Sequence, residues 1–446
     1  MYKKIELWIV LLLSVLFLVI LILYGSLLKS DFNGSKRFPK IQKIASFLAD
    51  IPKNTKEILN NYLDPGEPLR IFELEHRGKE RFIRYFKKER DELLVLPRYD
   101  YKSKRSIIEI IDLNTFKVIH QYSPDINEIN KKTDTSRFEF SKLNIDHHPN
   151  RFKFEHPILL YDGSIISHSQ YSPLFKIDYC GQLLWVNDHD SFHHAINIDN
   201  DNALWIPSKM YPYSNFVKNY RSDKNFIDDA ITKVNLDGEI VFQLSLAEIL
   251  YKNNIIGETI FKHRDDPLHL NDIEPVLFDG PYWKKGDLFL SIRDLGIIAL
   301  YRPDSNKIIY TIVGSFSGQH DVDIISDKEI SIFNNNNIGL KDSKNSEILI
   351  YDFEKKKLFK KFSKTLSVIN FKTDSEGLAE YFDDGSILLE EQNRGRLILI
   401  NSSGDVEWEY VNKDDKDNIY AITWSRIIKD KSKIKKIRDL SKNKCN

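Results

Sequence analysis

The chain has 446 residues, and its 65 Lys and Arg balance its 65 Asp and Glu, so the formal net charge at pH 7 is zero. This balance argues against a polybasic surface for nucleic acid, and the length is enough for one large domain or two ordinary ones. Aromatic residues make up 12% of the chain. Because aromatic side chains favour pleated surfaces, we expect mostly β-strands.

The N-terminal segment 5–28, IELWIVLLLSVLFLVILILYGSLL, is almost wholly apolar. About 20 such residues cross the hydrocarbon core of a bilayer, and the A-x-A-like cleavage site of a secretory signal is absent. We therefore predict an uncleaved membrane anchor over residues 1–29, with Trp8 and Tyr24 at its interfaces. More Lys and Arg follow this segment than precede it, and that count alone would place the rest of the chain in the cytoplasm.

Residues 30–68 are predicted to form a stalk with short helices. The spacing of apolar residues indicates a first helix, which is expected to end at Pro52. Asn54 and Glu57 form a capping-box pattern that opens a second short helix. We expect this segment to link the anchor to the domain, with partner binding as the alternative.

A unit of short strands separated by Asp, Asn and Gly turns repeats from residue 69 to residue 425. Its ending is visible six times, as IIEIIDLNTFKVIHQY, LFKIDYCGQLLWV, ITKVNLDGEIVFQL, IIALYRPDSNKIIYTI, ILIYDFEKKKLFKKF and LILINSSGDVEWEY. Such turns predict hairpins, and a repeat of about four strands is typical of a β-propeller blade. We predict an all-β, six-bladed β-propeller over residues 69–425, followed by a basic C-terminal tail over residues 426–446.

Two insertions interrupt the repeats, at residues 207–229 and 244–267. In the second insertion, Ser245 and Glu248 form a capping pattern that predicts a short helix. We expect the insertions to lie on one face of the propeller, where they can cover a pocket.

Three histidines stand at equivalent places, near the starts of their repeats: His194 in FHHAINIDNDNALW, His269 in HLNDIEPV and His320 in QHDVDII. Because the first strand of each blade lines the central channel, we expect these side chains to converge. His193 is expected to point to the opposite face, since neighbouring strand residues alternate. The other histidines are expected to be structural or surface residues; they are His120, His147, His148, His156, His168, His189 and His263.

Arg293 and Asn271 accompany the second histidine. Arg293 ends the next strand, and its guanidinium can bind two oxygens of a tetrahedral anion; an ion pair with Asp294 is the competing interpretation. Asn271 lies two residues after His269, on the same strand face, which makes it a candidate substrate-binding residue. Imidazoles and a guanidinium stabilise charge on a group in transfer, and a histidine can also be a nucleophile.

Other kinds of site have no pattern in this sequence. It contains no zinc-ligand spacing and no glycine-rich phosphate loop, so we expect no metal and no nucleotide cofactor. The two cysteines, Cys180 and Cys445, leave open whether they pair. The oligomeric state is equally open.

The segments HHAINIDNDNALW, HLNDIEPV with GDLFLSIRD, and GQHDVDIISDKEISIFNNN, in this order, resemble the bacterial arylsulfotransferase family of the aryl-sulfate-dependent type, over roughly residues 91–412. The resemblance implies a six-bladed propeller that transfers a sulfuryl group from a phenolic sulfate ester to a phenolic acceptor, through a sulfohistidine and without a cofactor. It implies His320 as the nucleophile. The sulfuryl-binding residues that it implies are His194, His269 and Arg293, with Asn271 beside them.

The same resemblance implies that the propeller lies in the periplasm, against the flanking charge count. Together with the predicted N-terminal anchor, this gives an inner-membrane, single-pass protein. Its partners would be an aryl sulfate, a phenolic acceptor and the membrane. The alternatives are a non-catalytic, membrane-anchored propeller that binds a ligand or partner protein, because fold does not fix function, and a quinoprotein-type propeller. The chain has only six Trp, which argues against the quinoprotein.

Overall fold

The computed structural model describes residues 6–32, 38–63, 70–71, 81–141, 143, 147–222, 225–337, 345–442 and 445. The chain forms two compact units. One comprises residues 1–65 and 258–265, and the other comprises residues 66–257 and 266–446.

The first unit contains α1 (Leu7–Phe32), α2 (Pro39–Leu63) and α7 (Ile260–His263). Residues Leu7–Ser30 of α1 have a mean hydropathy of 3.1, and this stretch is long and apolar enough to cross a membrane. Helix α2 continues through Pro52, whereas we expected two short helices with a break there. A proline removes one backbone donor and crowds the preceding turn, but helical apolar spacing resumes beyond it, so α2 stays a single helix.

The second unit is built from antiparallel sheets whose strands pair mostly in chain order. One sheet contains β3 (Leu93–Asp100), β4 (Arg105–Asp112), β5 (Lys117–Tyr122) and β27 (Arg426–Ile428). An eight-stranded sheet contains β6 (Glu155–Leu159), β7 (Ile165–His168), β8 (Ser172–Ile177), β9 (Leu183–Phe192), β10 (Asn197–Ile198), β11 (Leu204–Lys209), β12 (Asp229–Val234) and β13 (Ile240–Ser245).

The later sheets repeat this pattern. One contains β14 (Leu270–Pro275), β15 (Leu288–Ile292), β16 (Ile297–Arg302) and β17 (Lys307–Val313), and the next contains β18 (Val322–Ile324), β19 (Glu329–Asn334), β20 (Glu347–Asp352) and β21 (Lys357–Lys361). A further sheet contains β22 (Ala379–Tyr381), β23 (Ile387–Glu391), β24 (Arg396–Ile400), β25 (Val406–Val411) and β2 (Phe82–Arg84). A two-stranded ribbon pairs β1 (Arg70–Ile71) with β26 (Ile419–Tyr420).

Short helices lie between the strands: α3 (Ile126–Lys132), α5 (Asn215–Lys218), α6 (Leu246–Lys252), α8 (Ser363–Val368) and α9 (Lys431–Leu440). Single 3-10 turns cover Phe138–Phe140, Arg293–Leu295, Pro303–Ser305 and Gln392–Arg394. The capping pattern predicted α6 correctly, because Ser245 accepts the backbone N–H of Glu248 at the helix start.

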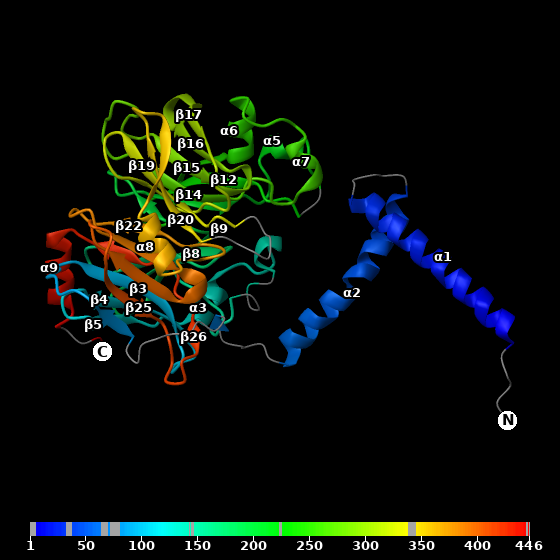
Figure 1. The fold of residues 1–446 in the computed structure, drawn as a ribbon, viewed down its shortest axis with the longest axis horizontal. Coiled ribbons are helices and arrows are strands. Elements are labelled where there is room, and N and C mark those ends of the chain that lie inside the picture. Colours follow the sequence, from blue (N-terminus) through cyan, green and yellow to red (C-terminus); the bar gives the residue numbers. More distant parts are fainter. Residues whose placement is uncertain are drawn as a thin grey trace. The chain divides into compact units, whose positions relative to one another are not determined.

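The sheets meet along their inner strands, since β14 contacts β10 and β18, and β27 contacts β6. The last strand of the chain, β27, pairs with β3, the first strand of its sheet, and sets Ile427 opposite Leu94. Figure 1 shows these sheets packed around one another, with the red C-terminal segment beside the blue-cyan strands β3, β4 and β5. This arrangement is a β-propeller, as the repeats predicted.

Segment 426–446, which we expected to be a basic tail outside the propeller, instead completes it. Its first residues form β27, and α9 follows, with Ile434 and Ile437 buried in the same core cluster as Phe154 and Leu159. The many lysines of this segment concealed the spacing of Ile434 and Ile437, which lie three positions apart and so face the same side of a helix.

Neighbouring sheets are joined by buried carboxyl groups that accept backbone N–H groups at the start of the next sheet. The acceptors and donors are Glu155 with His194, Asp229 with Leu270, Asp272 with Val322, Asp321 with Ala379, and Glu390 with Trp424 and Ser425. A buried N–H without a partner is costly, so these bonds fix where each inner strand begins.

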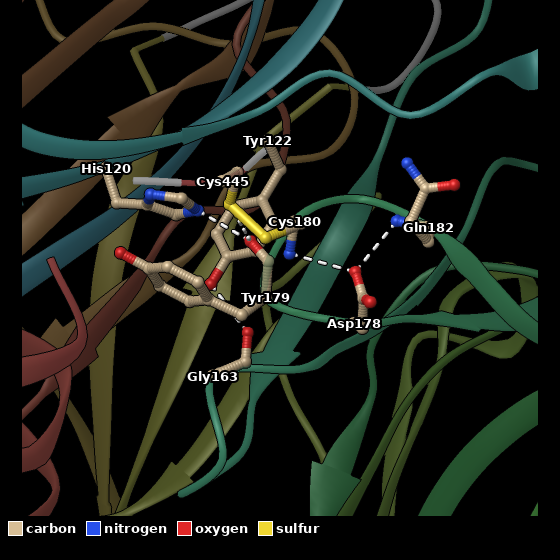
Figure 2. The surroundings of a disulfide bond; sticks show 8 residues. All are labelled: His120, Tyr122, Gly163, Asp178, Tyr179, Cys180, Gln182 and Cys445. Atoms are coloured by element: carbon tan, nitrogen blue, oxygen red, sulfur yellow. Dashed lines mark hydrogen bonds between the residues drawn. A yellow bond between two sulfur atoms is a disulfide. The ribbon is translucent and has the colours of Figure 1, made fainter. Parts of the chain in front are cut away.

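A disulfide joins Cys180 to Cys445 with a Cα–Cα distance of 5.4 Å, which answers the question that the sequence left open. Figure 2 shows the turn that carries Cys180, in which the backbone N–H of Cys180 donates to the Asp178 carboxylate. The ring of His120 stacks on that of Tyr179, and the two ring centroids are 3.8 Å apart. Disulfides persist in oxidising compartments. Together with the apolar N-terminal helix, this bond indicates an extracytoplasmic location.

Replacing Cys180 with Ser should lower the free energy of unfolding by about 2–4 kcal/mol, because the bond closes a long loop in the unfolded chain. Denaturant unfolding of the full chain in detergent measures this loss. A reductant should shift the midpoint of the wild-type protein and leave the variant unchanged; an unaffected wild-type midpoint would contradict the stabilising role.

Replacing Asp272 with Ala should also destabilise the propeller. It removes the acceptor of the buried Val322 N–H, and a buried donor left unpaired costs about 1–3 kcal/mol. The Asn197 amide loses one of its two acceptors and keeps the Ile273 carbonyl. Asp237→Ala, on an exposed turn, is the control and should change stability by less than about 0.5 kcal/mol. Equal unfolding midpoints for the two variants would refute the structural role of Asp272.

Candidate active site

The structure brings the three predicted histidines together. The ring centroid of His194 lies 5.1 Å from that of His269 and 5.6 Å from that of His320. All three side chains are buried, and they come from the segments that precede β10, β14 and β18. The equivalence of their positions in the repeat was therefore a sound guide to their convergence.

His193 belongs to the same cluster, although we expected it to point away. Its Nδ1 lies 2.8 Å from Nδ1 of His194, and its ring centroid lies 6.3 Å from that of His269. The pair follows the end of β9, and His194 has a φ of 62°. Strand alternation does not apply to a left-handed backbone, so both imidazoles enter the cluster.

His320 has a defined tautomer. Its Nδ1 lies 2.8 Å from the Gly318 carbonyl and 2.7 Å from Oδ1 of Asn335. The Asn335 amide nitrogen donates to the carbonyls of Thr373 and Glu376, which turns its oxygen toward the imidazole. Because both neighbours of Nδ1 are acceptors, Nδ1 carries the proton. Nε2 therefore holds the lone pair, and it accepts the N–H of Glu376 at 3.0 Å.

His269 is held by Asp266, a residue that the sequence analysis missed. The carboxylate of Asp266 contacts Nδ1 of His269, and within the described ranges the buried Nε2 has no hydrogen-bond partner. Burial favours the neutral carboxyl group, but the hydrogen bond from His269 and nearby positive charge outweigh it and lower the pKa of Asp266. The only available sequence signal was an Asp three residues before the histidine.

Arg293 stands beside the cluster on the turn after β15. Its Nε donates to Asp294 at 2.7 Å, so the ion pair considered from the sequence does form. Its two terminal nitrogens make no hydrogen bond to any described residue. Its backbone N–H donates to the His269 carbonyl at 3.1 Å, which ties the two segments together.

Asn271 is fully buried between the second and third histidine segments. Its amide nitrogen donates to the Gln319 carbonyl at 2.7 Å, while its Oδ1 has no partner in the described part of the chain. The observed bond holds neighbouring segments in place. The expected substrate contact of Asn271 stays a prediction.

Trp424 closes the cluster from one side, a role that no sequence pattern indicated. Its ring centroid lies 6.2 Å from that of His194 and 6.4 Å from that of His320, and its indole N–H donates to the Glu376 carboxylate at 2.8 Å. The side chain is fully buried and packs with Ala195. Trp424 precedes β27, so the closing segment also completes the cluster.

Burial decides the charge of these imidazoles. It lowers the pKa of His194 well below its usual value, and the neighbouring histidines and Arg293 lower it further. Burial likewise lowers the pKa of His320 to about 4, despite opposing contributions from Glu376 and Asn335. Both imidazoles are therefore neutral at pH 7, next to the permanent positive charge of Arg293. This combination offers lone pairs and a positive charge to a bound anion.

A separate hollow of about 320 Å³ lies nearby and has the opposite character. Its lining includes four carboxyl groups and one guanidinium, those of Glu274, Asp321, Asp323, Glu380 and Arg426. Two of its other lining residues, His156 and Leu378, contact Trp424. The amine of Lys429 also lines the hollow, and burial raises the pKa of Glu274, Asp321 and Asp323 well above their ordinary values. Among the described residues, no group of His, Cys, Asp and Glu is arranged to hold a metal ion.

Comparison with known proteins places this cluster in context. No curated protein matches the chain. Solved structures of similar fold include a protein of unknown function from Bacteroides caccae, 11% identical with a TM-score of 0.47, covering 76% of this chain and 99% of that one. Another is a virginiamycin B lyase from Staphylococcus aureus, 14% identical with a TM-score of 0.35, covering 59% and 71%. Likeness at this level says nothing about function.

A family model described as Arylsulfotransferase (ASST) matches residues 156–413. This range is more than half of the chain, and it contains the three converging histidines together with Arg293. The chain belongs to the arylsulfotransferase family.

Proposed function

We propose that this protein moves a sulfuryl group from a phenolic sulfate ester to a phenolic or other hydroxyl acceptor, through a sulfohistidine and without a nucleotide donor. Family membership supports sulfotransfer. The observation that carries the mechanism is the meeting of His194, His269 and His320 beside Arg293. We take the propeller as six-bladed. The eight-stranded sheet then contains two blades, because β9 and β11 pair with each other only through the last residues of each strand.

In the first half-reaction, Nε2 of His320 attacks sulfur. The bond between sulfur and the ester oxygen breaks, and a phenolate leaves. The tautomer supports this role, because the proton on Nδ1 is held by Gly318 and Asn335 and the lone pair is on Nε2. Before substrate binds, the backbone N–H of Glu376 donates to Nε2 of His320. This hydrogen bond breaks as the N–S bond forms.

The sulfuryl oxygens are held by Arg293 and His269. The terminal nitrogens of Arg293 donate to two of the oxygens, as a guanidinium does with tetrahedral anions. Asp266 contacts Nδ1 of His269 and orients the imidazole so that its Nε2, which has no partner among the described residues, faces the third oxygen. Asn271 lies beside this pair and contributes to substrate binding. Such donors act most strongly on charge that spreads over the oxygens in the transition state.

In the second half-reaction, the acceptor hydroxyl attacks sulfur and the N–S bond to His320 breaks. His194, which is neutral at pH 7, accepts the proton of that hydroxyl as a general base. This proton then passes to the phenolate released earlier. The net reaction exchanges an aryl sulfate and a phenol for a new phenol and a new aryl sulfate, and the enzyme is restored.

We place the protein in the inner membrane as a single-pass protein anchored by α1, with the propeller in the periplasm. The disulfide between Cys180 and Cys445 supports the oxidising side. The positive charges that follow α1 oppose this orientation, but the positive-inside rule is weaker for long translocated domains.

Replacing His320 with Asn should reduce transfer from a chromogenic aryl sulfate to a phenol at least about 1,000-fold, because the covalent intermediate cannot form. Mass spectrometry of the wild-type protein, treated with donor alone and kept alkaline, should find the sulfuryl group on His320. The matched control is His189→Asn, at a largely exposed histidine, which should keep full activity.

Retained transfer by the His320 variant, or a sulfuryl group found on His269, would overturn the assignment of the nucleophile. Binding of aryl sulfates and phenols without turnover by the wild-type protein would favour the non-catalytic propeller.

The pH dependence of transfer follows from the lowered pKa of His320, about 4. As the pH falls through this value, Nε2 becomes protonated and the nucleophile is lost. The rate should therefore be level from pH 7 to 5 and fall about tenfold per pH unit below 4. Circular dichroism at each pH separates this loss from unfolding. An acid limb centred near 6.5 would instead indicate an imidazole with an ordinary pKa.

A further inference from the structure

The first half of α2 carries a row of large apolar side chains that are exposed in the structure. Ile41, Ile44, Leu48 and Ile51 recur every three or four residues and are 53%, 59%, 49% and 41% exposed. Phe47, at 64%, widens the row. Residues at this spacing share one side of a helix, so the exposed side is a continuous apolar strip.

The other side of this half-helix is packed against α1. Gln42 and Ala45 are buried. The hydroxyl group of Tyr24 donates to the Ala45 carbonyl at 3.0 Å, and the amide of Gln42 donates to Ser30 Oγ at 2.8 Å. Tyr24 and Ser30 lie at the C-terminal end of the apolar stretch of α1. These contacts fix the start of α2 beside the end of the proposed membrane span.

This placement determines what surrounds the strip. If α1 crosses the bilayer, as proposed above, its C-terminal end lies at the membrane surface, and the first half of α2 lies at the same depth. Large apolar side chains are unfavourable in water and favourable in lipid. Lys40 and Lys43 are exposed beside the strip, where their long side chains reach anionic headgroups.

We infer that α2 is an interfacial helix, whose strip of Ile41, Ile44, Phe47, Leu48 and Ile51 enters the lipid next to the anchor. The partner of this surface is therefore the bilayer itself. The segment that we expected to link the anchor to the domain becomes a second attachment to the membrane. This inference rests on the proposed anchoring by α1 and adds to it.

Site-directed spin labelling tests this placement in the full-length protein, reconstituted into vesicles of phosphatidylcholine and phosphatidylglycerol. Both native cysteines are bound in the disulfide, so one introduced cysteine carries the label. Ile44→Cys and Leu48→Cys report on the strip. Ala49→Cys, exposed on the opposite side of α2, is the matched control, and Leu16→Cys reports on the anchor. Power saturation then compares access of oxygen, which enters lipid, with access of a water-soluble nickel chelate.

We expect the oxygen-to-nickel ratio to be several-fold higher at positions 44 and 48 than at position 49, and highest at position 16. Nickel access at 44 and 48 with a lipid-buried label at 16 would overturn the interfacial helix and leave the anchor standing. Labels at 44 and 48 that neither reagent reaches would overturn it as well, because protein would then cover the strip. Nickel access at position 16 would refute the anchor, and the inference with it.

Discussion

The propeller depends on a set of buried carboxyl groups that bind the backbone of the neighbouring sheet. Asp229, Asp272 and Asp321 each accept an N–H at or near the first residue of the next inner strand. Those strand starts are also where the histidines stand. His269 directly precedes Leu270, whose N–H donates to Asp229. The backbone N–H of His194 itself donates to Glu155. The contacts that hold the sheets together thus also position the imidazoles.

Burial gives the histidine cluster its chemistry. An imidazole in water is partly protonated near neutral pH, whereas His194 and His320 are kept neutral by their surroundings. Neutral imidazoles keep their lone pairs for attack and for proton transfer. The guanidinium of Arg293 stays charged under all these conditions. A low-dielectric site next to a permanent charge stabilises a transferring anion more than water does.

The repeats in the sequence predicted the β-propeller and the convergence of three histidines, because residues at equivalent places in a closed ring face one axis. The misses have physical causes. Alternation failed at His193, since the next residue has a left-handed backbone. Trp424 was not singled out, and the segment after residue 425 was expected to be a basic tail, because strand pairing across the whole chain leaves no local pattern. Asp266 was missed because its contact with His269 depends on the path of a loop, which also leaves no pattern in the sequence. Helix α2 continues through Pro52 because one lost hydrogen bond does not end a long helix.

The pairing of β27 with β3 has a consequence for how the protein is made. An exported chain emerges from its N-terminus, so His194, His269 and His320 reach the outside before Trp424 and β27. Until those residues arrive, the ring is open and the histidine cluster lacks the indole that closes it. The histidine cluster is therefore complete only after the C-terminal segment has been made.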